Sequence, residues 1–306
     1  MPLPEVRRLT VADLPALTIE VDRARSAGEF RASGDPDAAY VVKSIALDPG
    51  LGAGAFVDGE LVGFVSSEFK IVTVKPGSRR SGIGRALIDL ALEMERDRGR
   101  PDVLIGRSPD DGAGRAFLEA TGFRFHSHLW DLALPRDVAV AVPSWPDGTI
   151  ERPFDRTRDI EPWIALFNDA FADHATPLQL DPTFIVAGLA DPAIADADTG
   201  LVEDRASGEL LGFCATSPIR REGTVVSHGE IWTIGVRPDR QGRGLGRQLL
   251  RWGARYLRSI GVPDVWLSVN ARNERALRLY ESERFVRSRT RERWARPTGA
   301  GGRATT

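Results

Sequence analysis

The sequence predicts an α/β protein made of two tandem copies of one unit, each with a mixed central β-sheet flanked by helices. The chain has 306 residues, which fits two domains of about 150 residues each. Residues 75–88 read KPGSRRSGIGRALI and residues 237–250 read RPDRQGRGLGRQLL, so one type of glycine-rich loop precedes a helical pattern twice. Strand-like and helix-like patterns also follow one another in the same order around both loops.

The repeat is regular over most of the chain. Gly84 and Gly246 are 162 residues apart, and the same offset relates GRPDV to GVPDV at the end of the next helical pattern. The stretch between the copies, LPRDVAVAVPSWPDGT, is rich in proline and small residues, as is typical of a surface connection. The expected organisation is an N-terminal domain at 1–142, a C-terminal domain at 143–296 and a disordered tail at 297–306.

Each copy is expected to form the same elements in the same order. A helix precedes a β-hairpin, a further strand, the glycine loop with a long helix, a buried strand, a short helix and a last strand. The first copy has these patterns at 11–24, 52–65, 69–74, 85–99 and 102–106. The second copy has them at 160–174, 200–217, 230–236, 247–261 and 264–269.

Composition excludes several classes of protein. The formal charge is −2, from 41 basic and 43 acidic side chains, so no net field attracts nucleic acid or an anionic membrane. We find no signal-peptide core and no run of about 18 apolar residues, which favours a cytoplasmic protein. The single cysteine, Cys214, excludes an internal disulfide and a cysteine-based zinc cluster, and it is expected to be a small buried residue.

The glycine loops predict two phosphate-binding seats. A tight glycine loop at the start of a helix directs free backbone N–H groups into one concavity, at the positive end of the helix dipole. A Walker loop would need Gly-Lys-Ser/Thr, which neither copy has, and a dinucleotide fingerprint would need a glycine at Arg247. The remaining pattern, Gln/Arg-x-x-Gly-x-Gly, fits Gln241–Gly246 and Arg79–Gly84.

This pattern, found twice in a strand-loop-helix context, resembles the loop of the GCN5-related N-acetyltransferases (GNAT). The resemblance covers nearly all of both domains and implies two tandem GNAT-type domains that use acetyl-coenzyme A as cosubstrate and need no metal. It places the coenzyme in the second copy on Ile234, Gly235, Val236, Gln241, Gly242, Arg243, Gly244, Leu245, Gly246 and Arg247.

Acetyl transfer to an amine needs a base, a donor to the oxyanion and an acid for the thiolate. In SHGEIWTIGV, strand alternation predicts His228, Glu230, Trp232 and Ile234 on one face. Glu230 is the candidate base, acting through water, and a solvated strand-edge carboxylate is the alternative. His228 either relays the proton or faces solvent. Gly235 suggests a β-bulge near the strand end, which, as the resemblance implies, would turn the Val236 amide toward the thioester carbonyl.

The helix after the next strand supplies the other candidates. Asn270 and Asn273 flank its start, where their amides either cap the backbone or meet the pantetheine arm. Tyr280 follows two turns later, on the face of Asn273. By resemblance it is the tyrosine that protonates the coenzyme A sulfur, and a core aromatic is the alternative.

The first copy departs from this pattern. Leu118 stands at the position of Tyr280, and Ser108 at that of Asn270. Only 13 residues separate Gly63 from the loop proline, too few for two full strands, so Glu68 is expected near a turn. We expect this copy to be catalytically idle. It retains a possible coenzyme seat at Val72, Val74, Arg79, Arg80, Gly82, Gly84 and Arg85.

The expected acceptor is the primary amine of a small molecule. The tandem arrangement with a degenerate first copy resembles the mycothiol synthases, whose acceptor is a glucosamine-inositol thiol conjugate, although other tandem acetyltransferases share it. Asp173 and His174, after the first helix of the second copy, are candidate substrate residues, and a histidine near a helix end also suits the dipole. The alternating arginines of FVRSRTRERWARP either attract an acidic acceptor or form a solvated face. A non-catalytic acyl-coenzyme A sensor is the alternative function, and monomer or dimer stays open.

Overall fold

The computed structural model describes the chain except for residues 1–3, 30–37, 68–69, 173–194, 222–223 and 300–306. The chain divides into two compact units. Unit 1 comprises residues 1–130, 270–272 and 289–306, and unit 2 comprises residues 131–269 and 273–288. The mixed α/β fold predicted from the sequence is confirmed.

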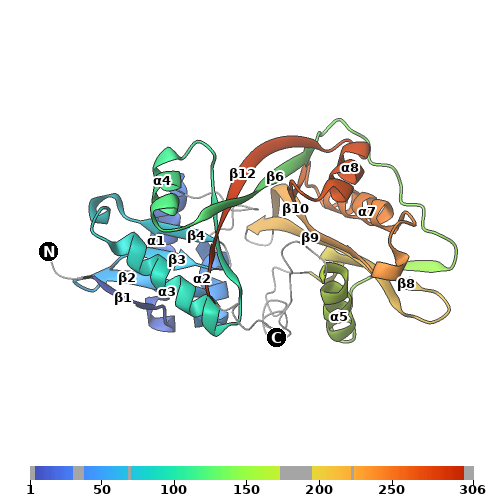
Figure 1. Ribbon diagram of the computed structural model, residues 1–306. Helices are drawn as coiled ribbons and strands as arrows, with labels where there is room; N and C mark the ends of the chain where they lie inside the picture. Colours follow the sequence, from blue (N-terminus) through green and yellow to red (C-terminus); the bar gives the residue numbers. More distant parts are fainter. Residues whose placement is uncertain (1–3, 30–37, 68–69, 173–194, 222–223, 300–306) are drawn as a thin grey trace, which may run out of the picture. The chain divides into compact units, whose positions relative to one another are not determined.

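The first half of the chain forms the following elements in order (Figure 1). They are β1 (Glu5–Arg8), η1 (Val11–Asp13), α1 (Leu14–Ser26), α2 (Ala38–Leu47), η2 (Pro49–Leu51), β2 (Gly52–Val57), β3 (Glu60–Ser66), β4 (Ile71–Val74), η3 (Pro76–Ser78), α3 (Ile83–Asp97), β5 (Asp102–Arg107), α4 (Gly112–Ala120) and β6 (Arg124–Leu134).

The second half repeats much of this order (Figure 1). Its elements are β7 (Thr149–Pro153), α5 (Ile160–Phe171), η4 (Asp196–Asp198), β8 (Thr199–Asp204), β9 (Leu210–Arg221), β10 (Thr224–Val236), η5 (Pro238–Arg240), α7 (Leu245–Ser259), β11 (Asp264–Asn270), α8 (Glu274–Ser282) and β12 (Val286–Pro297). The spans α3/α7 and α4/α8 keep the 162-residue offset of the repeat.

In unit 1, β1, β2, β3 and β4 form an antiparallel sheet in chain order. Asp58 and Gly59 both have positive φ in the turn between β2 and β3, which is the type I′ geometry that Asp-Gly favours in two-residue hairpins. The amphipathic helix α3 buries Leu87, Ile88 and Ala91 in the main core of this unit.

In unit 2, the strand order is β11-β10-β9-β8-β7, with β10 and β11 parallel and the other pairs antiparallel. Successive residues of β9 show how the two faces are covered. Phe213 packs against Trp163 and Phe167 of α5, whereas Cys214 lies against Gly253 of α7. Helices α5 and α7 therefore cover opposite faces of this sheet (Figure 1). Cys214 is fully buried, as expected, and burial raises the pKa of its thiol.

The end of the chain belongs to unit 1. Residues Glu292–Pro297 of β12 pair antiparallel with β5, from Glu292/Arg107 to Pro297/Asp102. Trp294 is buried in the same core cluster as α3. The sequence analysis assigned residues 143–296 to the second domain, whereas in the structure residues 289–297 group with unit 1.

The connection between the repeats is held against unit 2. The guanidinium of Arg258 in α7 donates to the carbonyls of Pro135 and Val138, and Arg255 donates to Val140 O at 3.1 Å. Residues 131–142 accordingly group with unit 2. A proline-rich composition does not distinguish such a docked connection from a loose one.

Candidate active site

The two glycine loops have nearly the same backbone conformation. Gly244, the N-cap of α7, has φ 87° and ψ −11°, and Gly82, the N-cap of α3, has φ 86° and ψ −12°. The Gln241 side chain donates to Val236 O at 3.1 Å, and Arg79 donates to Val74 O at 2.8 Å, at the equivalent place. The repeat inferred from the sequence therefore extends to the backbone conformation of the two loops.

The glycines of the second loop allow its left-handed backbone conformation and leave open space beside it. Gly242 and Gly244 both have positive φ, and a methyl group added at either would meet no atom within 4 Å. In unit 1, Arg80 takes the place of Gly242 and has φ 64°, a left-handed conformation that costs a non-glycine residue about 1 kcal/mol. A methyl group at Gly84 would come within 3.0 Å of the Phe117 ring, whereas at Gly246 the nearest atom is 3.8 Å away.

Arginines surround the second loop. Arg275 of α8 donates to Gln241 Oε1 at 2.6 Å, so α8 and the loop are joined. Arg251 and Arg247 both pair with Glu283, at 2.8 and 3.3 Å. Arg243, between the two glycines, is exposed. The helix start thus carries positive charge in addition to its own dipole, which favours an anionic ligand.

Next to the loop, the two parallel strands of unit 2 separate. The pairing of β10 with β11 runs from His228/Asp264 to Glu230/Trp266, although β10 continues to Val236 and β11 to Asn270. Arg237 N donates to Leu211 O, so this N–H points toward β9. In an antiparallel pair, the N–H groups of successive residues point alternately toward the partner strand and away from it. The N–H groups of Ile234 and Val236 therefore point to the opposite edge of β10, the one from which β11 separates.

Glu230 lies at the point where the strands separate, beside a second buried carboxylate. Glu230 is 8% exposed, and Asp131 in β6 is 3% exposed. Ser268 Oγ of β11 lies 2.9 Å from Asp131 Oδ1 and 3.3 Å from Glu230 Oε1. Because a hydroxyl has one hydrogen, Ser268 donates to one carboxylate at a time and links the two. Glu230 is thus buried, and the solvated strand-edge alternative does not hold.

The predicted face of β10 is wrong for Ile234, because a β-bulge lies at Trp232. Ile231 pairs with Thr216 and Thr233 with Ala215, so Trp232 is the extra residue. Trp232 stacks on Phe167 of α5, with ring centroids 6.2 Å apart, whereas Val236 lies beside Gly246 of α7. The bulge therefore moves the even-numbered residues that follow Trp232 to the opposite face of the sheet. Ile234 consequently shares the face of Val236 and not that of Trp232.

Gly235 has a different role from the predicted one. Its pairing with Phe213 is regular, so the bulge expected at this residue is not there. A methyl group at Gly235 would come within 2.2 Å of the Phe213 ring. Gly235 is required because the ring of Phe213, which packs against aromatic residues of α5, fills the space that a side chain at this position would occupy. The Val236 N–H nevertheless points to the edge that the prediction required.

Tyr280 lies on α8 in a largely apolar setting, with its ring 6.2 Å from that of Phe285. Burial raises its pKa to about 12, and nearby Cys214 contributes in the same direction. Among the described residues, its hydroxyl has no hydrogen-bond partner. It is therefore a protonated phenol at neutral pH, able to donate to a ligand.

The two asparagines have local structural roles. Asn273 Oδ1 accepts from Ala276 N at 3.1 Å and caps α8, as Asp111 caps α4 in unit 1. Asn270 Oδ1 accepts from Arg272 N, and its amide nitrogen lies 3.3 Å from Ser127 Oγ. The capping alternative for Asn273 is thus observed.

Unit 1 lacks several of these features. Leu118, at the position of Tyr280, is fully buried. Strands β3 and β4 have 7 and 4 residues, against 12 and 13 for β9 and β10, so the strand pair is short as the spacing predicted. Arg79 pairs with Glu29 at 2.9 Å. Glu68, Asp173 and His174 lie outside the described residues, as does the side chain of His228.

Sequence reasoning missed Asp131, Ser268 and Arg275. Asp131 comes from the last strand of the first repeat, so no local pattern links it to Glu230. Ser268 has a local signal, because it is the one polar residue within the run VWLSV. Arg275 is one of many exposed arginines, and its sequence position does not single it out.

The chain is similar to known acetyltransferases. The model of the acetyltransferase (GNAT) family matches residues 160–284. The mycothiol acetyltransferase of Sanguibacter keddieii is 33% identical over 253 residues, which cover 80% of this chain and 78% of that protein. That of Thermomonospora curvata is 35% identical over 221 residues, or 71% and 69% of the two chains.

Two solved structures share the fold over nearly the whole chain. A tandem GNAT protein from the clavulanic acid biosynthesis pathway has a TM-score of 0.68 at 19% identity, covering 97% of this chain and 99% of that one. A GCN5-related N-acetyltransferase from Sphaerobacter thermophilus has a TM-score of 0.65 at 21% identity, covering 96% of each chain.

The chain belongs to the GNAT family of acetyltransferases, as the loop pattern indicated. It is an acyl-coenzyme A-dependent acetyltransferase with the tandem GNAT fold. Over the part of the chain that the structure describes, no helix is both long and apolar enough to cross a bilayer.

Proposed function

We propose that unit 2 transfers the acetyl group of acetyl-coenzyme A to the primary amine of a glucosamine-inositol thiol conjugate. The observation that carries the catalytic assignment is the buried Glu230 at the point where β10 and β11 separate, next to the glycine loop. The acceptor class is supported by relatives named mycothiol acetyltransferases, which match more than two thirds of this chain.

The coenzyme fits the loop and the free edge of β10. The amides of residues 242–247 and the exposed Arg243 would hold the pyrophosphate, since the space above Gly242 and Gly244 is open. The N–H groups of Ile234 and Val236 would bind the extended arm and the thioester oxygen. Acetyl-coenzyme A supplies an acyl carbon bonded to a good thiolate leaving group.

Two side chains of unit 2 would handle the protons. The amine nitrogen attacks the thioester carbon, a C–N bond forms and the C–S bond breaks. Glu230 accepts the amine proton through water, and the Tyr280 phenol gives a proton to the departing sulfur. Ser268 and Asp131 do not touch the substrate in this scheme; they position Glu230 and keep it in the gap between the strands.

The experiment is acetyl transfer by the full chain, with a panel of amines that includes the glucosamine-inositol thiol conjugate. Product mass identifies the acetylated amine, because a thiol-bearing acceptor interferes with colour assays for free coenzyme A. Glu230→Gln should reduce kcat by about 100-fold with little change in the KM of acetyl-coenzyme A. Turnover of another amine with no turnover of the conjugate would refute the acceptor. Binding of coenzyme A without turnover of any amine would favour a sensor.

We also propose that unit 1 carries out no acetyl transfer. Leu118 replaces the phenol of Tyr280, and the short β3–β4 pair lacks the residues that continue along β10 in unit 2.

A further inference from the structure

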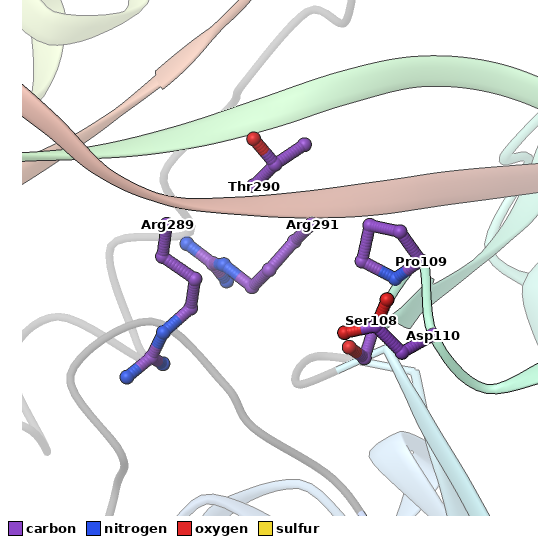
Figure 2. A pocket seen from close by; sticks show the side chains of 6 residues that line it. All are labelled: Ser108, Pro109, Asp110, Arg289, Thr290 and Arg291. Atoms are coloured by element: carbon purple, nitrogen blue, oxygen red, sulfur yellow. The ribbon is translucent and has the colours of Figure 1, made fainter.

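Unit 1 has a polar pocket of about 260 Å³ between the residues after β5 and the strand β12 (Figure 2). It is lined by Ser108, Pro109, Asp110, Arg289, Thr290 and Arg291. Arg289 and Arg291 lie on the same side of β12, and both interact with other groups of the protein. Arg291 is only 8% exposed, so the expectation of a solvated face does not hold for it. The charge of these arginines therefore does not indicate a ligand.

In unit 2, an exposed tryptophan lies close to the proposed base. Trp232 is 47% exposed, although tryptophan is on average a well-buried residue. It is the extra residue of the β-bulge in β10, two positions after Glu230. Trp232 has no role in the proton transfers of Glu230 and Tyr280, so the exposure of so large an apolar ring next to them calls for another explanation.

Trp232 and Glu230 lie on the same face of the sheet of unit 2. Ile231, between them, faces α7, because a methyl group placed on Gly253 of α7 would lie 3.4 Å from its Cγ1 atom. The side chains before and after Ile231 therefore point to the other face, which α5 covers. Two residues of a strand span about 7 Å, so a ligand of modest size can reach both side chains.

The ring of Trp232 is the last of three aromatic rings that stack on one another. Phe167 stacks on Phe213 at 5.8 Å with an interplanar angle of 24°, and Trp232 stacks on Phe167 at 6.2 Å and 22°. Phe213 and Phe167 are buried. The stack thus begins in the core and ends in an indole that is nearly half exposed and is held in one orientation by the ring beneath it.

Residues of the neighbouring strands complete the surface around Glu230. Ser217 of β9 and Trp266 of β11 both pair with Glu230, and directly paired residues of adjacent strands share a face of the sheet. Ser217 is exposed, and Trp266 is partly buried. The surface next to the proposed base therefore presents flat aromatic rings together with a hydroxyl group.

We propose that Trp232 stacks on the pyranose ring of the acceptor and so selects acceptors that carry a sugar ring next to the amine. This inference rests on the proposed function, in which the acceptor contains glucosamine. A pyranose has a face of C–H bonds, which can pack on an indole, and a rim of hydroxyl groups, which need polar partners such as Ser217. Because Phe167 already holds the indole, little ordering of the protein is needed on binding.

The test is calorimetric titration of the full chain with the glucosamine-inositol thiol conjugate. Saturating coenzyme A is present, which allows binding of the acceptor but no acetyl transfer. Trp232→Leu keeps an apolar side chain without the flat ring and should raise the Kd of the conjugate about tenfold. Trp232→Phe keeps an aromatic ring and should raise that Kd about threefold or less. The KM of acetyl-coenzyme A should stay within about twofold in both variants, which shows that the coenzyme seat is intact.

Trp252→Leu is the matched control. Trp252 lies on α7 of the same unit, where it packs against Gly200 of β8 and donates to Glu151 at 2.9 Å. It is thus a tryptophan on the opposite face of the sheet from Glu230. This substitution should change the Kd of the conjugate by less than about twofold. Thermal unfolding of each variant confirms that it is folded.

Two competitors distinguish the rings of the conjugate. Methyl α-glucopyranoside should compete more weakly in Trp232→Leu than in the wild type, whereas competition by myo-inositol should be the same in both. An unchanged Kd in Trp232→Leu, an equal loss in Trp252→Leu, or a loss confined to inositol would each overturn the proposal. A conjugate that binds without being acetylated would refute the proposed function, and the Kd values would still decide the role of Trp232. A wild-type chain that does not bind the conjugate would refute both.

Discussion

At the scale of single residues, the link between Glu230 and Asp131 through Ser268 determines how the proposed base is held. Two carboxylates this close to one hydroxyl, both almost fully buried, restrict each other's orientation. Ser268→Ala removes the shared hydroxyl without adding volume. We expect kcat to fall about three- to tenfold while the KM of acetyl-coenzyme A stays the same.

The conservative variant distinguishes positioning from packing. Ser268→Thr keeps a hydroxyl on a β-strand, where threonine is favoured, and should recover most of the activity. If Ser268→Thr were as slow as Ser268→Ala, the hydroxyl would have no role in holding Glu230.

The phenol of Tyr280 predicts a pH dependence. A proton donor is active below its pKa, and with that pKa at about 12 Tyr280 stays protonated throughout pH 7–10. Tyr280 should therefore cause no alkaline fall in rate within this range. Tyr280→Phe should lower kcat about 100-fold at every pH tested, because the acid is absent in all cases. A wild-type rate that falls near pH 8 or 9, with the fall missing in Tyr280→Phe, would contradict this assignment.

At the scale of elements, the two loops provide a matched pair of variants. Gly244 and Gly82 have the same φ and ψ within 1°. Gly244→Ala and Gly82→Ala should each cost about 1 kcal/mol in the free energy of unfolding, through the left-handed backbone. Only Gly244→Ala should raise the KM of acetyl-coenzyme A, by about tenfold. Equal effects of the two substitutions on KM would show that unit 1 takes part in turnover.

The elements also show where sequence reasoning succeeds. Helices α3 and α7 and their loops were predicted because apolar periodicity and glycine conformation are local properties. The bulge at Trp232 was missed, because a strand pattern of alternating residues carries no sign of the register of its partner. Gly235 was correctly singled out but for the wrong reason, since its neighbour Phe213 comes from another strand. The pair of Asp131 with Ser268 was missed for the same reason.

At the scale of the whole molecule, the repeat seen in the sequence does not define the units of the fold. Residues 270–272 and 289–306 group with the first half of the chain, and residues 131–142 with the second. Duplication explains why each half has the same elements. It does not determine which half each last strand pairs with, because strand pairing depends on contacts far apart in sequence.

This pairing predicts that the C-terminal strand is needed for unit 1 to fold. Ending the chain after residue 288 removes the partner of β5 and the buried side chain of Trp294, which is 5% exposed. Loss of the tryptophan alone is expected to cost about 3–5 kcal/mol, a large part of the stability of a typical domain. Ending the chain after residue 299 keeps the whole strand and serves as the control. Thermal unfolding and limited proteolysis should show unit 1 opened in the 1–288 chain and intact in the 1–299 chain.

A fragment of residues 1–142 should likewise fail to fold alone and should gain structure when a peptide of residues 289–299 is added. A stable, cooperatively unfolding 1–142 fragment would show that the first repeat is complete without β12.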